Sequence, residues 1–187
     1  MPRIRAFIAI PTSGEIKQSI SAVQAELIKS QADVKWEGTE KFHITLKFLG
    51  DSELEVLQSL RSELQTALRD IHSFDLVYRS VGCFPNVSRP RVVWIGAAEN
   101  PQLSEFQQRV EEVCGRFGFP KEDRAFHAHI TLGRVRGNRH LDRLTEIVKT
   151  VTFEPMQARC AEVHIMRSEL RPTGSVYTLL NSIPLVP

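Results

Sequence analysis

The tetrapeptide His-Ile-Thr-Leu occurs twice in this chain of 187 residues, at positions 43–46 and 129–132. The second copy begins 86 positions after the first (129 − 43 = 86). The apolar segments that open the two halves, at Ile4 and Arg91, lie 87 positions apart (91 − 4 = 87). An offset shared by a motif and its surroundings indicates an internal duplication, and so long a period predicts two similar lobes rather than a solenoid.

The predicted secondary structure repeats with the same offset. Runs of apolar and β-branched residues predict strands, and apolar stripes at helical spacing predict helices. Strands are expected at residues 4–10, 42–48, 74–81, 91–95, 127–132, 161–166 and 175–180. Helices are expected to bury apolar stripes within residues 16–27, 54–68, 103–117 and 141–148.

These elements predict an α+β fold with two pseudo-symmetric lobes. Each lobe is expected to be an antiparallel-dominated sheet with helices on its outer face, and the functional site is expected in the cleft between the lobes. We predict one bilobal domain over residues 1–187, whose duplicated halves span approximately 1–88 and 89–187.

Capping residues predict where the helices begin. Side-chain oxygens of Ser, Thr, Asp and Asn accept hydrogen bonds from the free amide groups of the first helical turn. The predicted N-caps are Thr12, in a capping box with Glu15; Asp51 or Ser52; Asn100, followed by Pro101; and Asn138. Gly118 is predicted to end the third helix.

Each copy of the motif places one imidazole and one hydroxyl on the same face of its strand. Side chains alternate between faces along a strand, so His43 and Thr45 point one way while Ile44 points into the core. His129 and Thr131 share a face in the same manner. If the two lobes face each other, both polar pairs meet across one cleft.

Two imidazoles and two hydroxyls are suited to displacement at phosphorus. An unperturbed imidazole has a pKa of about 6.5, so one ring can accept a proton while the other donates one near neutrality. The hydroxyls can donate to phosphate oxygens. A strained cyclic phosphate needs little more for ring opening. The pattern therefore predicts hydrolysis without a metal, with His43 and His129 as the catalytic residues.

Composition excludes several other classes of protein. Hydrophobic residues make up 42% and charged residues 25% of the chain, which argues for a globular rather than a disordered protein. No segment is suited to be a signal peptide or a membrane span. Cys83, Cys114 and Cys160 form no CxxC pair, so reduced thiols and a cytoplasmic location are expected.

The chain resembles the two-histidine (2H) phosphoesterase superfamily, specifically the RNA 2′,3′-cyclic phosphodiesterases, also called 2′–5′ RNA ligases. The resemblance covers nearly the whole chain and is carried by residues 5–11, 42–50, 82–85, 91–94, 129–134 and 167–177. It implies that His43 is the general acid and His129 the general base, with no cofactor. It implies hydrolysis of the cyclic phosphate to a 2′-phosphomonoester, together with reversible 2′–5′ RNA ligation.

The resemblance also implies that Thr45, Thr131 and Arg134 bind the phosphate. Arg134 alternates with His129, so it can reach the phosphate only if the strand bulges or ends near Gly133. The implied partner is RNA with a 2′,3′-cyclic phosphate terminus, such as a tRNA fragment, and the enzyme is expected to be a monomer that makes no membrane contact.

Alternative interpretations remain open for the histidines and for the function as a whole. His43, His127 and His129 could together ligate zinc, although no acidic or cysteine fourth ligand lies nearby in the sequence. The substrate could instead be a small cyclic nucleotide or oligoadenylate. A non-catalytic RNA-binding module of the same fold is a further alternative, which the intact histidine and threonine pairs disfavour.

Basic and aromatic residues near the motifs also allow two interpretations. Between Arg124 and Arg143 five arginines stand against one acid, which is typical of either a solvated face or an anion-binding surface. Lys47 could contact the phosphate weakly or lie in solvent at a strand end. The aromatic residues that could stack on a base are Trp36, Trp94 and Tyr177, with Trp94 expected in the core.

Overall fold

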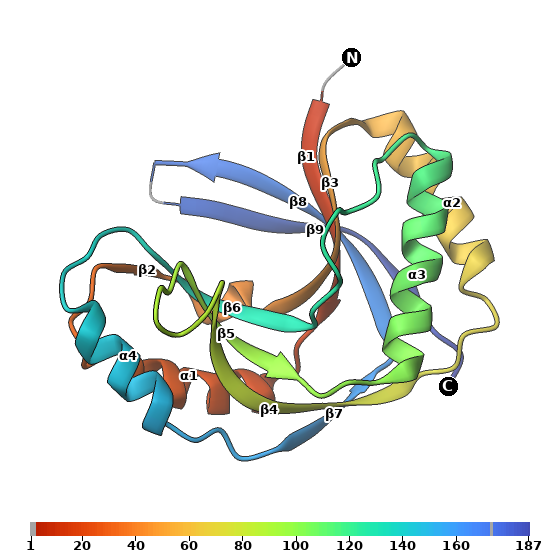
Figure 1. The fold of residues 1–187 in the computed structure, drawn as a ribbon. Helices are drawn as coiled ribbons and strands as arrows, with labels where there is room; N and C mark the ends of the chain where they lie inside the picture. Colours follow the sequence, from red (N-terminus) through yellow and green to blue (C-terminus); the bar gives the residue numbers. More distant parts are fainter. Residues whose placement is uncertain (1–2, 173) are drawn as a thin grey trace.

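The computed structural model describes residues 3–172 and 174–187. Within these residues the chain forms nine strands, four α-helices and one short 3₁₀-helix (Figure 1), which confirms the predicted α+β class. In chain order the elements are β1 (Arg3–Pro11), α1 (Gly14–Ile28), β2 (Val34–Trp36), η1 (Thr39–Lys41), β3 (His43–Glu53), α2 (Leu54–Ala67), β4 (Phe74–Phe84), β5 (Val92–Ala97), α3 (Pro101–Arg116), β6 (His129–Val135), α4 (Leu141–Thr150), β7 (Met156–Cys160), β8 (Glu162–Arg171) and β9 (Gly174–Pro184).

The nine strands form one strongly curled antiparallel sheet, shaped like a half-barrel (Figure 1). The hydrogen-bonded order is β7-β4-β5-β6-β3-β1-β8-β9, and β2 pairs with the C-terminal part of β6. At the middle of this order β3 and β6 meet through one residue pair, Ile44 and Ile130. The two histidine motifs therefore lie on neighbouring strands at the centre of the sheet.

The strand order has the symmetry expected of a duplicated chain. When elements are matched by the offset of 86 to 87 residues, β1 corresponds to β5, β3 to β6 and β4 to β8. With β7 and β9 at the two edges, the order is the same outward from the β3–β6 junction in both directions. Ile44 and Ile130, which pair at this junction, are equivalent positions. These relations support our proposal that residues 1–88 and 89–187 arose by internal duplication.

Each lobe of the sheet contains strands from both halves of the sequence. β4 precedes residue 88, yet it pairs with β5 and β7. β8 and β9 belong to the second half, yet β8 pairs with β1 and β9 extends the sheet beyond it. This exchange ties the two halves into one continuous sheet, because each half supplies strands to the other lobe.

The helices pack in two pairs, each with one helix from either half of the sequence. α1 packs beside α4, and α2 packs beside α3 (Figure 1). Their apolar stripes are buried as predicted, except for Leu54 at the start of α2, which is exposed, and they join one continuous core with Ile44 and Ile130. Burial of an amphipathic face supplies most of the stability of such helices. Since the two isoleucines point into this core, the histidines beside them point to the opposite face.

The predicted helix starts are confirmed for α3 and wrong for the other three helices. Asn100 accepts hydrogen bonds from the amides of Gln102 and Leu103, at 2.8 and 3.1 Å, and Pro101 is the first helical residue. Gly118 follows the end of α3 with a positive φ of 81°, as predicted for a glycine that ends a helix. At α1 the cap is Ser13 rather than Thr12, and its hydroxyl accepts from the amide of Ile16.

The caps predicted for α2 and α4 fail because neighbouring strands hold the backbone. Asp51 and Ser52 remain in β3, paired with β1, so α2 begins only after Glu53. Asn138 lies in a segment whose flanking residues, Arg136 and Arg139, exchange backbone hydrogen bonds with Asp33, so α4 begins after His140. β2 and β7 are short strands that the sequence pattern did not predict.

Candidate active site

One pocket brings together all five predicted site residues. It has a volume of about 440 Å³, and its lining includes His43 and Thr45 of β3 with His129, Thr131 and Arg134 of β6. The position of the pocket follows from the sheet. Residues on either side of the Ile44–Ile130 pair point away from the core, so both histidine–threonine pairs converge on the same face of neighbouring strands.

A β-bulge brings Arg134 into the pocket. Trp94 of β5 pairs with Thr131, whereas Val93, the preceding residue, pairs with Gly133. Leu132 is therefore the extra residue, and the alternation of side chains changes after it. The bulge near Gly133 that the sequence analysis required, if Arg134 is to share the face of His129, is therefore present. Residue 133 must be small here, because a Cβ atom on Gly133 would lie 2.7 Å from Val34 and 2.8 Å from Trp36.

The bulge in β6 is supported by a buried glutamine that no sequence pattern identifies. The side-chain amide of Gln24, on α1, donates to the carbonyl oxygens of Leu132, at 2.9 Å, and of Glu37, at 2.8 Å. The amide of Glu37 also donates to the Leu132 carbonyl, at 2.8 Å. Because a bulged residue loses its place in the ladder, these donors satisfy a carbonyl that would otherwise be unpaired.

β3 bulges at the equivalent position. Ile8 of β1 pairs with Lys47 and Ala9 with Thr45, so Leu46 is the extra residue. Lys47, which the sequence placed near the phosphate or in solvent, lines the pocket but is almost fully buried, with 1% of its side chain exposed. Its ammonium group pairs with Glu111 of α3 at 2.9 Å and donates to the carbonyl oxygen of Pro120. Lys47 therefore joins β3 to the segment that leads into β6.

His43 lies in a largely apolar environment. Its ring stacks on Phe7 with centroids 4.9 Å apart, and Tyr177 approaches edge-on at 5.5 Å. Its Nε2 lies 3.0 Å from the hydroxyl oxygen of Thr45. Burial lowers the pKa of His43 to about 4, helped by the charges of Lys17 and His129 and opposed by a hydrogen bond to the backbone of Lys41. The free ring is therefore neutral at pH 7.

His129 is held in one orientation by its backbone. Its Nδ1 lies 2.7 Å from the carbonyl oxygen of His127. A carbonyl can only accept, so Nδ1 carries the proton and Nε2 of the neutral ring is left with its lone pair. Burial lowers the pKa of His129, with smaller contributions from the charges of His127 and Arg134. In its neutral form His129 is therefore ready to accept a proton at Nε2.

Aromatic residues beside the histidines were largely missed from the sequence. Phe7 lines the pocket beside His43, and Phe84 lies edge-on to His129 with centroids 4.9 Å apart. Phe7 and Trp94 occupy equivalent positions of the duplication, so matching the halves residue by residue would have identified both. Trp94, expected in the core, is instead half-buried beside Thr131 and packs on Phe84.

Further pocket residues come from loops and edge strands, where no periodic pattern identifies them. Of the three candidate stacking residues, Tyr177 lines the pocket, together with Glu37 and Lys41. Arg124 also lines it, so two members of the basic segment, Arg124 and Arg134, reach the site. Arg143 lies elsewhere, on α4.

The zinc alternative lacks a ligand set. Within residues 3–172 and 174–187, no group of three or more His, Cys, Asp or Glu side chains is arranged to hold a metal ion. His127 contacts Trp94 and Phe84 edge-on instead.

The cysteines are buried and unpaired, and burial raises their pKa values to about 11 for Cys83 and about 12 for Cys114 and Cys160.

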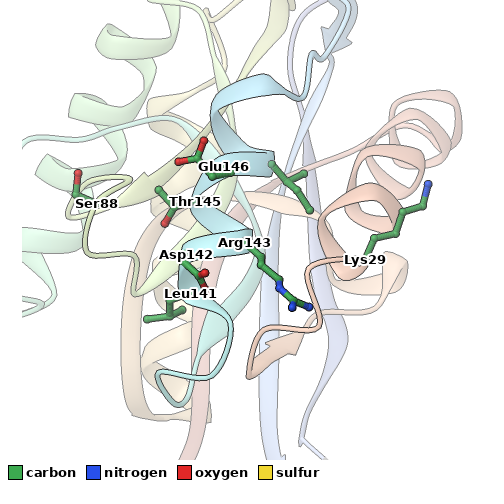
Figure 2. Close-up of a pocket in the computed structure, with 8 residues that line it drawn as sticks. Lys29, Ser88, Leu141, Asp142, Arg143, Thr145 and Glu146 are labelled. Carbon is green, nitrogen blue, oxygen red and sulfur yellow. The ribbon is translucent and has the colours of Figure 1, made fainter.

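A second hollow, of about 670 Å³, lies beside α4, away from the histidines. Figure 2 shows Leu141, Asp142, Arg143, Thr145 and Glu146 of α4 around it, with Lys29 at the end of α1. Its charged groups are of both signs, and it contains none of the predicted site residues. Size alone therefore does not identify the functional site, whereas convergence of the two motifs does.

Comparison with known proteins agrees with this arrangement. A family profile described as the 2′-5′ RNA ligase superfamily matches residues 14–172. An RNA 2′,3′-cyclic phosphodiesterase of Methanothermobacter thermautotrophicus is 35% identical over 178 residues, which cover 94% of this chain and 96% of that protein. A protein of the same description from Archaeoglobus fulgidus is 32% identical, covering 93% and 96% of the two chains.

A solved structure shares the whole fold. The crystal structure of E. coli LigT complexed with 3′-AMP has a TM-score of 0.79 to this chain, at 26% identity, and the match covers 99% of each chain. Among the described residues, no helix has both the length and the apolar character that a membrane crossing requires.

Proposed function

This chain belongs to the 2′-5′ RNA ligase superfamily, and we propose that it hydrolyses RNA 2′,3′-cyclic phosphate ends to 2′-phosphomonoesters. The observation that carries the proposal is the convergence of two histidine–threonine pairs and Arg134 on one pocket. Its relatives that are RNA 2′,3′-cyclic phosphodiesterases support this substrate class. Reversible 2′–5′ ligation of RNA ends is the same chemistry run backwards and is part of the proposal.

In the proposed mechanism the two imidazoles exchange protons with the reacting oxygens. Nε2 of His129 takes a proton from the attacking water, which forms the new P–O bond. Protonated His43 donates its proton to the 3′ oxygen as the P–O3′ bond breaks, which leaves the phosphate on the 2′ oxygen. No step requires a metal, since each proton removed or supplied is handled by one of the two histidines.

The bound phosphate supplies the electrostatics that the free pocket lacks. Protonating His43 at pH 7, against a pKa of about 4, costs about 4 kcal/mol. A unit negative charge about 4 Å away returns about 4 kcal/mol in a site of intermediate polarity. A cyclic phosphodiester carries such a charge, so its arrival can protonate His43 at the moment when the acid is needed.

The two threonines and Arg134 are proposed to bind the phosphate rather than to transfer protons. Hydroxyl groups and a guanidinium donate charge-assisted hydrogen bonds to phosphate oxygens, and these are stronger than neutral ones. Fixed donors also stabilise the charge that builds on those oxygens in the transition state.

A monomer suffices for this activity, because both histidines come from one chain. The three unpaired, buried cysteines support the expectation of a reducing compartment such as the cytoplasm.

The test is hydrolysis of a short oligoribonucleotide that ends in a 2′,3′-cyclic phosphate, with EDTA present throughout. We expect turnover, a 2′-phosphate as the product, and loss of activity in His43→Ala and His129→Ala. Parallel assays on 3′,5′-cyclic AMP and on 2′–5′ oligoadenylate address the competing substrates. Higher kcat/KM on either of these would overturn the RNA assignment, and binding without turnover would favour a non-catalytic module.

A further inference from the structure

Two lysine side chains converge at the rim of the active-site pocket, at the N-terminal end of β9. A Cβ atom placed on Gly174 would lie 3.1 Å from Nζ of Lys35 and 3.6 Å from Nζ of Lys41. Lys41 lines the pocket, whereas Lys35 is half-buried on β2. Gly174 has a φ of +135°, a conformation that favours glycine. Because glycine has no side chain, residue 174 itself places no atoms between the two ammonium groups.

The sheet places this pair of lysines beside the phosphate-binding residues. Lys35 and Arg134 are register partners in the β2–β6 ladder, so their side chains leave the sheet on the same face. Arg134 lines the pocket, as does Tyr177, three residues after Gly174 on β9. In Figure 1 the β8–β9 hairpin extends from the sheet on the side where β2 lies.

The cluster carries more positive than negative charge. Lys41 pairs with Glu37 at 3.1 Å, and both side chains are about 15% exposed. Neither Lys35 nor Arg134 forms an ion pair with any other described residue. Lys35, Lys41 and Arg134 therefore bring three positive charges to this edge of the pocket, where Glu37 pairs with one of them. Like charges held this close repel each other, so an anion that binds between them is stabilised.

We propose that Lys35 and Lys41 form a second phosphate subsite, which binds the phosphodiester on the 5′ side of the terminal nucleotide. The inference rests on the proposed function. When the cyclic phosphate lies between the histidines, the next phosphate of an RNA can only be the one on the 5′ side. A cyclic mononucleotide lacks that group. The subsite therefore selects RNA ends over small cyclic nucleotides.

The test compares three substrates: 2′,3′-cyclic AMP, the dinucleotide ApA ending in a 2′,3′-cyclic phosphate, and the same dinucleotide with a neutral methylphosphonate linkage. The native protein should show kcat/KM roughly five- to tenfold higher on the charged dinucleotide than on the other two substrates. This advantage should shrink as salt rises, because exposed charges are screened.

Substitution of the lysine provides the second arm of the test. Lys35→Gln should reduce the preference for the charged over the neutral dinucleotide to less than about twofold. Lys149→Gln, which removes an exposed lysine paired with Glu146 on α4, is the matched control and should keep the full preference. Equal kcat/KM on the charged and neutral dinucleotides in the native protein would overturn the subsite while leaving the proposed function intact. No turnover of any of the three would overturn both.

Discussion

Strands β3 and β6 carry the same tetrapeptide, yet they hold their histidines in different surroundings. His43 stacks on Phe7, and its Nε2 contacts the hydroxyl of Thr45. His129 lies edge-on to Phe84, and no hydrogen bond joins it to its own threonine among the described residues. Burial lowers both pKa values, to about 4 for His43. Equivalent strands position two like groups, and their unlike neighbours give each histidine different surroundings, which the proposed roles of acid and base require.

The buried polar side chains that support the bulges of β3 and β6 also differ between the two strands. Both strands bulge at the leucine of the motif, and both bulges lie near a buried polar side chain from a helix in the other half of the chain. For β6 this residue is Gln24, a neutral amide bonded to backbone carbonyls. For β3 it is Glu111, at the position equivalent to Gln24, and its partner is the buried Lys47. If the halves arose by the proposed duplication, the position of the supporting side chain was kept and its chemistry changed.

Removal of either histidine should have the largest effect on turnover. Loss of a positioned acid or base lowers turnover roughly 100- to 10,000-fold. His129→Ala should lose the acid limb of the pH–rate profile, which reports protonation of the base. His43→Ala should lose the alkaline limb, which reports deprotonation of the acid. His72→Ala, at an exposed site, serves as the control. Turnover near that of the parent in either active-site variant would contradict the two-histidine mechanism.

Substitution of Lys47 and of Gln24 should show that the buried ion pair at β3 contributes more to the free energy of unfolding than the buried amide at β6. Lys47→Met leaves the carboxylate of Glu111 buried without its partner, which should lower the free energy of unfolding by about 3–5 kcal/mol. Gln24→Leu removes the donor to the carbonyl of Glu37 and one of the two donors to that of Leu132, and it should cost about 1–3 kcal/mol. Urea unfolding measures both. The double variant Lys47→Met, Glu111→Leu should recover most of the loss, and a double variant no more stable than Lys47→Met would show that the ion pair is not the cause.

The two threonines should behave alike in binding and differently in pH dependence. Thr45→Val and Thr131→Val each remove a donor to a charged phosphate, at a cost of about 1.5–3 kcal/mol in kcat/KM. Arg134→Ala should cost at least as much, because its contact can be bidentate. Thr45→Val should also move the alkaline limb, since Thr45 contacts Nε2 of His43, whereas Thr131→Val should leave the profile in place. Unchanged kcat/KM in all three variants would return these residues to a structural role.

The smallest expected effects are shifts in titration. NMR titration of the free protein should give a pKa of about 4 for His43 and a value below 6.5 for His129. Since both groups titrate below 6.5, kcat/KM should fall as pH rises above that value. Bound substrate is anionic and raises both pKa values, so the optimum of kcat should lie at higher pH than that of kcat/KM. Equal pH optima for kcat and kcat/KM would show that bound substrate does not raise the two pKa values.

Exposure of His43 to solvent should change the pKa of this histidine and leave that of His129 nearly unchanged. Tyr177→Ala removes a ring that covers His43, so the pKa of His43 should rise toward 6.5, while that of His129 should change little. Tyr177→Phe keeps the ring and should leave both values near those of the parent. Equal shifts at the two histidines in Tyr177→Ala would show that their surroundings are not independent.

The sequence by itself determined the parts of the site that depend on local alternation. Two identical motifs in a strand context place His43 with Thr45 and His129 with Thr131 on one face each, whatever the rest of the chain does. The helix cap at Asn100 with Pro101 is equally local, because its donors lie two and three residues away. The α+β class follows from the periodicities of the segments, which need no partner to be recognised.

Tertiary structure alone decided which strands became neighbours and what surrounds each motif. Register between strands far apart in the sequence places Leu132 in a bulge and so brings Arg134 into the pocket of the two histidines. The burial of Lys47 depends on Glu111, 64 positions away, and on a carbonyl beyond α3. Local pattern fixes the face on which a side chain lies. The charge, hydrogen bonds and burial that it meets there are set by segments that only the folded sheet brings together.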